Sequence, residues 1–238
     1  MRACCGRRGF ARLGLKIAEI FYSVQGEGGL VGVPSVFIRT SGCNLRCSWC
    51  DTPYTSWKPE GEELSIDVIV ERAGEFPAAK HVVLTGGEPM IAPGIVELSE
   101  RLRGRGFHIT IETAGTVYAP VPCDLMSISP KLANSTPEGA FRQQHERLRL
   151  QPETLRRLMG VCDYQLKFVI AREEDLTEAQ AVIATAGAPA ANVVLMPEGI
   201  SAEVLNERGA WIAELCKAHG YRFSPRLHVH LYGNARGT

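Results

Sequence analysis

Three cysteines lie close together near the start of the chain. Cys43, Cys47 and Cys50 follow Gly42 at Cys-x3-Cys-x2-Cys spacing, and no further Cys or His occurs in the next thirty residues. Thiolates spaced this closely in one loop can bind one metal centre. Structural zinc usually takes four protein ligands, and a cubane iron–sulfur cluster is usually held by four cysteines. We therefore predict a 4Fe-4S cluster with one iron that lacks a protein ligand and is open to another molecule.

Two glycine-rich segments also have the composition of binding sites. Thr85-Gly86-Gly87-Glu88-Pro89 follows a predicted strand, at the end where parallel α/β folds bind ligands. Its glycines allow a ligand to approach the backbone closely, although Gly-Gly after a strand is by itself a common turn. The other segment, residues 23–29, places Gln25 and Glu27 among glycines, where Glu27 is either a ligand for a hydrogen-bond donor or a solvated turn residue. Arg39, four residues before Cys43, is expected to bind an anion with its planar fork or to pair with a structural acid.

The hydrophobic pattern indicates the elements that must position these groups. Strands are predicted at residues 15–22, 35–40, 80–85, 107–112, 125–129, 164–170, 192–196 and 226–232, and helices at 65–73, 94–103, 153–159, 173–184 and 202–218. Ser65 is the expected N-cap of the first helix, Thr177 is a possible cap within the fourth, and residues 53–63 are expected to form a loop. From residue 80 onward the alternation gives about six mostly parallel strands with fewer helices. This predicts an α/β fold, a partial TIM-like barrel short of eightfold closure.

Length and composition favour one globular domain. The chain has 238 residues, of which 45% are apolar and 22% charged. We expect a tail at 1–14 and a single domain at 15–238. A polar, basic insertion at about 132–151 is predicted to be a solvated surface segment rather than a partner site.

Charge and hydropathy disfavour two partner classes. The formal net charge is zero, which argues against nucleic acid, because phosphate binding requires concentrated Lys and Arg. The basic tail lacks the apolar core of a signal peptide, and no apolar run reaches the roughly 20 residues that span a bilayer. We expect a cytoplasmic protein that does not bind membranes.

The remaining five of the eight cysteines are not expected to bind the cluster. Without a secretory signal, a disulfide framework is not expected. Cys123, Cys162 and Cys216 have apolar surroundings and are predicted to be buried structural thiols, and no ligand role is predicted for Cys4 and Cys5 in the tail.

Taken together, these motifs resemble the radical S-adenosylmethionine superfamily. Gln25-Gly26-Glu27-Gly28, combined with Cys50-Asp51-Thr52, narrows the resemblance to the 7-carboxy-7-deazaguanine synthases, and it extends from about Ile17 to the end of the chain. It implies a radical SAM core in which S-adenosylmethionine binds the open iron and is cleaved to a 5′-deoxyadenosyl radical. The cofactor contacts that it implies are Trp49, Cys50, Asp51, Gly87, Glu88, Glu112, Ser129, Lys131, Gln165 and Lys167. Lys131 and Lys167 lie in apolar strand contexts, which also suggests anionic partners, because a buried unpaired Lys is costly.

The same resemblance implies the substrate and the reaction. The family converts 6-carboxy-5,6,7,8-tetrahydropterin to 7-carboxy-7-deazaguanine with loss of ammonia, through radical ring contraction and without a protein acid or base. The implied substrate contacts are Val24, Gln25, Gly26, Glu27, Arg39, Thr85, His228 and Thr238. Glu27 can accept hydrogen bonds from two neighbouring donors of the pyrimidine ring. Thr52 is the implied Mg²⁺ ligand, whereas from the residues alone Asp51 is the more obvious one. In a strand at 226–232, His228 and His230 would share a face, so at least one could reach the site.

The resemblance also implies an external electron donor, such as flavodoxin, and a homodimer. Two other functions remain open from the sequence. A glycyl-radical-activating enzyme would share the cysteine loop and the Gly-Gly-Glu-Pro segment, but would not need the pterin and magnesium residues. A non-catalytic zinc or iron–sulfur module would bind metal without cleaving S-adenosylmethionine.

Overall fold

The structure, a computed structural model, describes residues 14–238; the basic tail with Cys4 and Cys5 lies outside the described residues. Its strands are β1 (Gly14–Val24), β2 (Pro34–Thr40), β3 (Glu62–Ser65), β4 (His81–Gly86), β5 (His108–Thr113), β6 (Leu125–Ile128), β7 (Asp163–Ile170), β8 (Val193–Pro197) and β9 (Arg222–Phe223). Its α-helices are α1 (Pro53–Ser56), α2 (Ile66–Gly74), α3 (Ile95–Gly104), α4 (Arg142–Arg149), α5 (Pro152–Met159), α6 (Asp175–Ala186), α7 (Ala202–His219) and α8 (Leu227–Tyr232).

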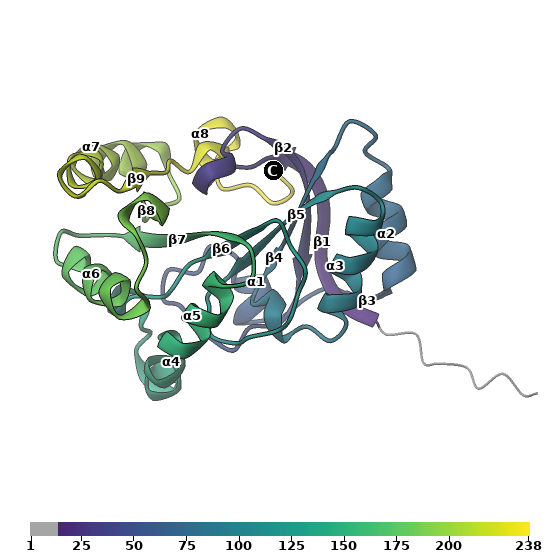
Figure 1. Ribbon diagram of the computed structural model, residues 1–238, viewed down its shortest axis with the longest axis horizontal. Coiled ribbons are helices and arrows are strands. Elements are labelled where there is room, and N and C mark those ends of the chain that lie inside the picture. Colours follow the sequence, from purple (N-terminus) through teal and green to yellow (C-terminus); the bar gives the residue numbers. More distant parts are fainter. Residues whose placement is uncertain (1–13) are drawn as a thin grey trace, which may run out of the picture.

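The strands form one curved sheet in the order β3-β1-β2-β4-β5-β6-β7-β8-β9 (Figure 1). Every neighbouring pair from β2 to β9 is parallel, whereas β1 runs antiparallel to both β2 and β3. The sheet ends at β3 on one side and β9 on the other, so it stays open. The predicted α/β fold with an incomplete barrel is confirmed.

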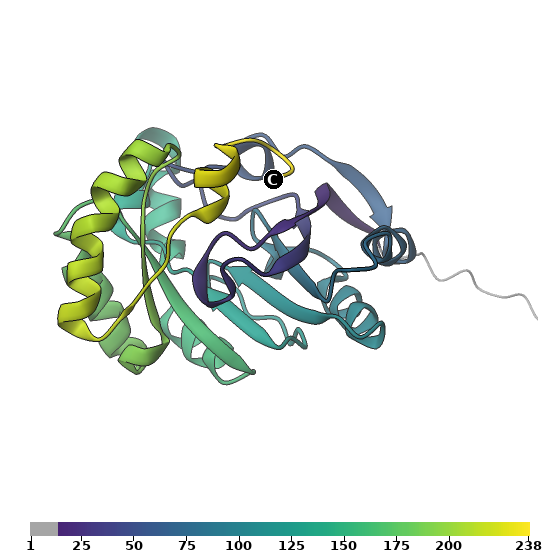
Figure 2. The same ribbon diagram turned by 90° about the horizontal axis from the view of Figure 1, so that it is seen from above.

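Alternation along the strands separates the core from a polar inner face. On β2, Val36 and Ile38 are fully buried in the core, while Phe37 and Arg39 lie on the opposite face and line a cavity. Helices α2, α3, α6 and α7 lie along the outside of the sheet (Figures 1 and 2) and bury apolar side chains against it. Each fully buried Leu or Ile contributes about 1.5–3 kcal/mol of transfer free energy relative to an exposed one.

The predicted N-cap of α2 is confirmed, but the predicted loop at 53–63 and the possible cap at Thr177 are not. Ser65 caps α2 by accepting a hydrogen bond from the Val68 N–H at 3.4 Å. Residues 53–63 are more than a loop, because α1 begins at Pro53, a favourable first helical position, and β3 begins at Glu62. Thr177 is not a cap, since α6 already begins at Asp175.

The last predicted strand is wrong. Residues 227–232 form helix α8, and the position beside β8 is taken by the two-residue strand β9. The chain leaves the sheet after β9 because it binds the β1–β2 connection: Gly28 N–H donates to Ser224 Oγ at 2.7 Å, and Leu227 N–H donates to the Gly26 carbonyl at 2.9 Å. Figure 2 shows α8 beside that connection. No helix within residues 14–238 has the length and hydropathy needed to cross a bilayer.

Candidate active site

One cavity lies at the carboxyl ends of the parallel strands and draws its lining from the whole described chain. Most residues predicted from the sequence line it: Val24, Gln25, Gly26, Glu27, Arg39, Cys43, Cys47, Trp49, Cys50, Asp51, Thr52, Thr85, Gly87, Glu112, Ser129, Lys131, Lys167, His228 and Thr238. Glu88 and Gln165 are outside this lining. Residues far apart in sequence therefore converge because strand ends and loops meet at one edge of the sheet.

The cysteine loop presents three thiols to this cavity in apolar surroundings. Leu45, Ala114 and Leu148 pack around them. Burial raises the pKa of the Cys43 thiol to about 11 and that of Cys47 to about 12. Thiolates at these positions would therefore need a cationic metal centre for stabilisation, which fits an iron–sulfur cluster.

Over the described residues, no three His, Cys, Asp or Glu side chains gather where a single metal ion could bind them all. A cubane cluster does not require this, because each cysteine binds its own iron.

Contacts from α1 and from the Gly-Gly-Glu-Pro segment hold the cysteine loop. The Cys50 sulfur lies 3.2 Å from Ser56 Oγ, and the Trp57 indole N–H donates to the Cys47 carbonyl at 3.1 Å. Glu88 N–H donates to the Gly42 carbonyl at 2.9 Å. A Cβ at Gly87 would overlap the same carbonyl, so only glycine permits this close approach.

The insertion at 132–151 also contacts the cysteine loop. Most of α4 is exposed, as predicted, but His145 is only 1% exposed. Its Nδ1 accepts from the Arg46 N–H at 3.2 Å, and its Nε2 lies 2.9 Å from Ser135 Oγ, which donates to the Leu132 carbonyl at 2.7 Å. These bonds require a neutral ring protonated on Nε2, and burial lowers the pKa of His145 accordingly.

A lysine lies beside the thiols without a carboxylate partner. Lys131 Nζ donates to Ser129 Oγ at 3.0 Å and lies 5.7 Å from the centre of the Trp49 ring. The Trp49 indole N–H donates to the Asn134 carbonyl at 2.9 Å, which fixes the ring. Within residues 14–238 no ion pair involves Lys131, so its ammonium is available to an anion bound next to the cysteines.

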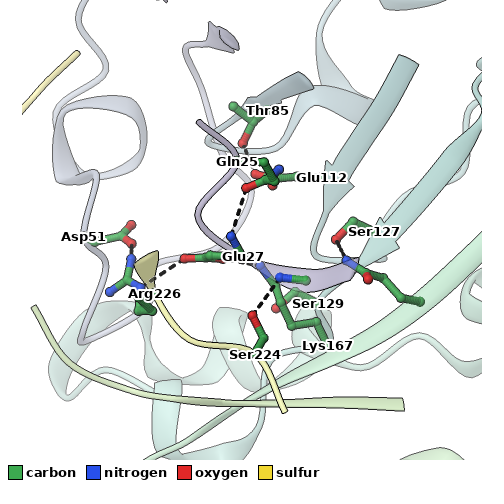
Figure 3. Close-up of polar contacts among 12 residues, drawn as sticks. Gln25, Glu27, Asp51, Thr85, Glu112, Ser127, Ser129, Lys167, Ser224 and Arg226 are labelled. Carbon is green, nitrogen blue, oxygen red and sulfur yellow. Dashed lines mark hydrogen bonds and ion pairs between the residues drawn. The ribbon is translucent and has the colours of Figure 1, made fainter. Parts of the chain in front are cut away.

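Four charged side chains form an alternating row across the cavity (Figure 3). Asp51 pairs with Arg226, which donates from Nε to Glu27 Oε1 at 3.0 Å, and Lys167 pairs with Glu27 Oε2. Burial alone would raise the pKa of Glu27, but Lys167 and Arg226 hold it below its usual range. Burial alone would lower the pKa of Lys167, and Glu27 reverses this. Glu27 and Lys167 are therefore both charged.

The loop that carries Glu27 is bonded to Glu112 on β5, which in turn accepts a hydrogen bond from β4. Gln25 Oε1 accepts from the Glu27 N–H at 3.1 Å, and Gln25 Nε2 donates to Glu112 Oε1 at 3.0 Å (Figure 3). Thr85 Oγ1 donates to the other Glu112 oxygen at 2.8 Å. These bonds orient both Gln25 and Glu27 from strands on the sheet.

Helix α8 brings His228 to the cavity through close contact with Gly26. The His228 ring occupies the space that a Cβ at residue 26 would need. Burial lowers the pKa of His228. His230 is exposed and outside the cavity lining. The expectation that both histidines share a face is wrong, because residues two apart lie on nearly opposite sides of a helix.

Arg39 takes the second of its two predicted roles in this structure. Its Nε donates to Glu19 Oε2 at 3.1 Å, and Glu19 also accepts from Arg236 at 2.7 Å and from the Tyr54 hydroxyl at 3.1 Å. The Arg39 side chain nonetheless lines the cavity. Thr52 Oγ1 lies 3.9 Å from the Cys50 sulfur, so Thr52 is next to the cysteine loop.

Glu88 and Gln165 hold loops in this structure. Glu88 is fully buried and accepts from Met90 N–H at 3.1 Å, Thr113 Oγ1 at 2.7 Å and Ala114 N–H at 2.8 Å. Gln165 accepts from the Gly29 N–H and donates to Ser127 Oγ, both at 2.8 Å.

Sequence reasoning missed Arg226, Ser56, Glu19 and the contacts of Arg236. Arg226 directly precedes an apolar run in the sequence, which could have suggested that it is buried. A buried charged side chain needs a partner. Its partners, Glu27 and Asp51, are far away in the sequence and gave no local indication. Ser56 and Glu19 carried no signal that separates them from ordinary polar positions.

This chain is similar to known proteins along most of its length. Residues 37–164 match the Radical SAM superfamily. A curated 7-carboxy-7-deazaguanine synthase from Rhodopirellula baltica is 46% identical, covering 94% of this chain and 89% of its own. The protein of the same name from Halobacterium salinarum is 44% identical, covering 94% and 93%. The crystal structure of QueE from Escherichia coli aligns with a TM-score of 0.70 at 26% identity, covering 91% of this chain and 95% of that one.

Proposed function

The chain belongs to the radical SAM superfamily and, within it, to the 7-carboxy-7-deazaguanine synthases, and we propose on this basis that it converts 6-carboxy-5,6,7,8-tetrahydropterin to 7-carboxy-7-deazaguanine with release of ammonia. The observation that carries the proposal is the shared cavity. It contains both the three-cysteine loop and the Gln25–Glu27 pair that suits a pyrimidine edge.

The proposed cofactors are a 4Fe-4S cluster and S-adenosylmethionine. Cys43, Cys47 and Cys50 hold the cluster in the apolar surroundings formed by Leu45, Ala114 and Leu148. When bound, the cluster supplies the electron that cleaves S-adenosylmethionine to the 5′-deoxyadenosyl radical. Lys131 is the proposed partner of the cofactor carboxylate, because its ammonium lies beside the thiols without an ion pair among the described residues.

Glu27 is the proposed anchor for the pyrimidine half of the pterin. It is charged, and its orientation is fixed by Lys167 on one oxygen and Arg226 on the other. A carboxylate has about four lone-pair sites, so each oxygen can accept one more hydrogen bond. The ring N–H and 2-amino group of the pterin can fill these two sites together. Arg39 is the proposed partner of the substrate carboxylate, and its Nε also forms an ion pair with Glu19.

Thr52 is the proposed protein ligand of Mg²⁺. Mg²⁺ prefers oxygen ligands and usually keeps several waters, so one hydroxyl plus substrate oxygens is a reasonable set. Asp51 is occupied by Arg226, which makes it less available to the ion and supports Thr52. On the family resemblance we also propose an external electron donor, such as flavodoxin, and a homodimer.

An anaerobic assay tests the proposal. Cluster-reconstituted protein is incubated with reductant, S-adenosylmethionine, Mg²⁺ and the tetrahydropterin, and products are identified by mass spectrometry. We expect 7-carboxy-7-deazaguanine and release of ammonia. Cleavage of S-adenosylmethionine without pterin turnover would refute the substrate, and a protein that carries iron and sulfide but cleaves nothing would refute the enzymatic function.

A further inference from the structure

Two cysteines outside the cavity lie in contact with each other. Cys123, between β5 and β6, and Cys162, directly before β7, are both free, and their sulfur atoms are 3.2 Å apart. Cys123 is 6% exposed, whereas Cys162 is partly exposed. The prediction of a buried structural thiol is therefore wrong for Cys162.

The sheet register explains why these residues meet. Strands β6 and β7 are parallel neighbours in which Leu125 pairs with Asp163. Cys123 and Cys162 each precede that pair by one or two residues, at the amino ends of the two strands. The cavity lies at the carboxyl ends, so the two thiols are at the opposite edge of the sheet from the cysteine loop.

The two sulfurs differ in character. The hydrogen bond between them raises the pKa of Cys123 and lowers that of Cys162. The more exposed sulfur is thus the one that more readily becomes a thiolate, the nucleophilic form of cysteine. The buried thiol beside it is placed to react second.

We propose that Cys123 and Cys162 are a modification site that forms a reversible disulfide by exchange with a low-molecular-weight disulfide such as oxidised glutathione. The Cys162 thiolate attacks one sulfur of that disulfide, forms a mixed disulfide and releases one thiolate. Cys123 then loses its proton and attacks the Cys162 sulfur, which releases the second thiol. Two protein thiols are oxidised by two electrons, and the small disulfide is reduced to two thiols.

This site is independent of the proposed function. It uses none of the residues that line the cavity, and it joins two positions 39 residues apart in the chain. The oxidised form ties the start of β7 to the segment that enters β6.

Trypsin digestion gives a direct test, because the fragments 106–131 and 158–167 each contain one cysteine, Cys123 and Cys162 respectively. Cluster-loaded protein is treated anaerobically with oxidised glutathione, free thiols are blocked with N-ethylmaleimide, and the digest is analysed by mass spectrometry. We expect the two fragments to be linked, with the loss of two hydrogens, and the link to disappear after dithiothreitol.

Single-cysteine variants distinguish Cys162, which reacts first with glutathione, from Cys123, which closes the disulfide. Cys123→Ser should accumulate glutathione on Cys162 instead of the cross-link, and Cys162→Ser should form neither. Buried Cys216 is the internal control and should react at least about tenfold more slowly than Cys162. Glutathione that stays on Cys162 of the unmodified sequence, or a cross-link from Cys162 to any cysteine other than Cys123, would overturn the proposal.

Discussion

Replacing Glu27 with glutamine should destabilise the fold and weaken substrate binding for separable reasons. The side chains of Lys167 and Arg226 are each 7% exposed, and Glu27 is the carboxylate that both of them contact (Figure 3). Within the described residues Lys167 has no other ion-pair partner, whereas Arg226 keeps Asp51. Removing one partner of a buried pair costs about 3–5 kcal/mol. We expect about 3 kcal/mol for Glu27→Gln, because the amide oxygen still accepts a hydrogen bond, and a fall in the unfolding midpoint of roughly 6–12 °C.

A double mutant distinguishes the two effects. In Glu27→Gln with Lys167→Met, no unpaired Lys remains, so the free energy of unfolding should return to within about 1 kcal/mol of the original. Substrate binding should not return, since two charge-assisted hydrogen bonds worth about 1.5–3 kcal/mol each stay weakened in both variants. We expect kcat/KM for the pterin to fall by about a hundredfold in each.

The measurements are thermal unfolding of the cluster-loaded proteins under anaerobic conditions and initial rates at varied pterin concentration. Unchanged stability of Glu27→Gln would refute the argument about the buried pair. Recovered turnover in the double mutant would refute the role of Glu27 as a substrate ligand. Iron and sulfide content, measured for every variant, checks that the cluster is intact.

Four further predictions concern the cluster, the metal ion, acid stability and the loop contacts. Cys47→Ala should lose the cluster and all cleavage of S-adenosylmethionine, and iron and sulfide analysis that still finds a full cluster would contradict its role as a ligand. Thr52→Ala should keep the cluster but lose the dependence of the rate on Mg²⁺, which a magnesium titration measures. Because the pKa of Glu27 is held below its usual range, its ionised form stabilises the fold above the unfolded value of about 4.3, and this contribution is lost as the pH falls toward the folded pKa. The free energy of unfolding should therefore drop more steeply below about pH 4 than it does in Glu27→Gln, and parallel curves would contradict this. His145→Ala should release iron from the reconstituted cluster at least about tenfold faster, because the Arg46 N–H loses a buried acceptor worth about 1–3 kcal/mol. The exposed neighbour Gln144→Ala should release iron at the original rate, and equal rates for the two variants would refute the effect.

Sequence reasoning worked where the signal was local. The cysteine spacing and the Gly-Gly-Glu-Pro segment each lie within a few residues, and the resemblance that they carry is confirmed by the family match. The strand predicted at 35–40 is also present, and its alternation places Arg39 on the face opposite Val36 and Ile38. Most residues named from the sequence consequently line one cavity.

Sequence reasoning failed where tertiary contacts determine the local structure or the burial of a side chain. The alternating apolar residues of 226–232 predicted a strand, but the segment forms helix α8 and bonds to Gly26 instead. The partners of Arg226 come from two distant loops, which no periodicity reveals. The polar composition of 132–151 describes its exposed face correctly and says nothing of His145, whose burial depends on a loop about a hundred residues earlier.

The way this insertion reaches the cysteine loop has an evolutionary consequence. Two of its contacts use backbone carbonyls: Ser48 N–H donates to the carbonyl of Ser135 at 2.9 Å, and the Trp49 indole N–H donates to that of Asn134. Every amino acid supplies such a carbonyl, so point substitutions that leave the backbone in place would keep these two bonds. A one-residue insertion or deletion between Lys131 and Ser135 would move both carbonyls at once. Changes of length in this part of the gene should therefore be selected against, although the segment lies at the surface, where length changes are ordinarily tolerated.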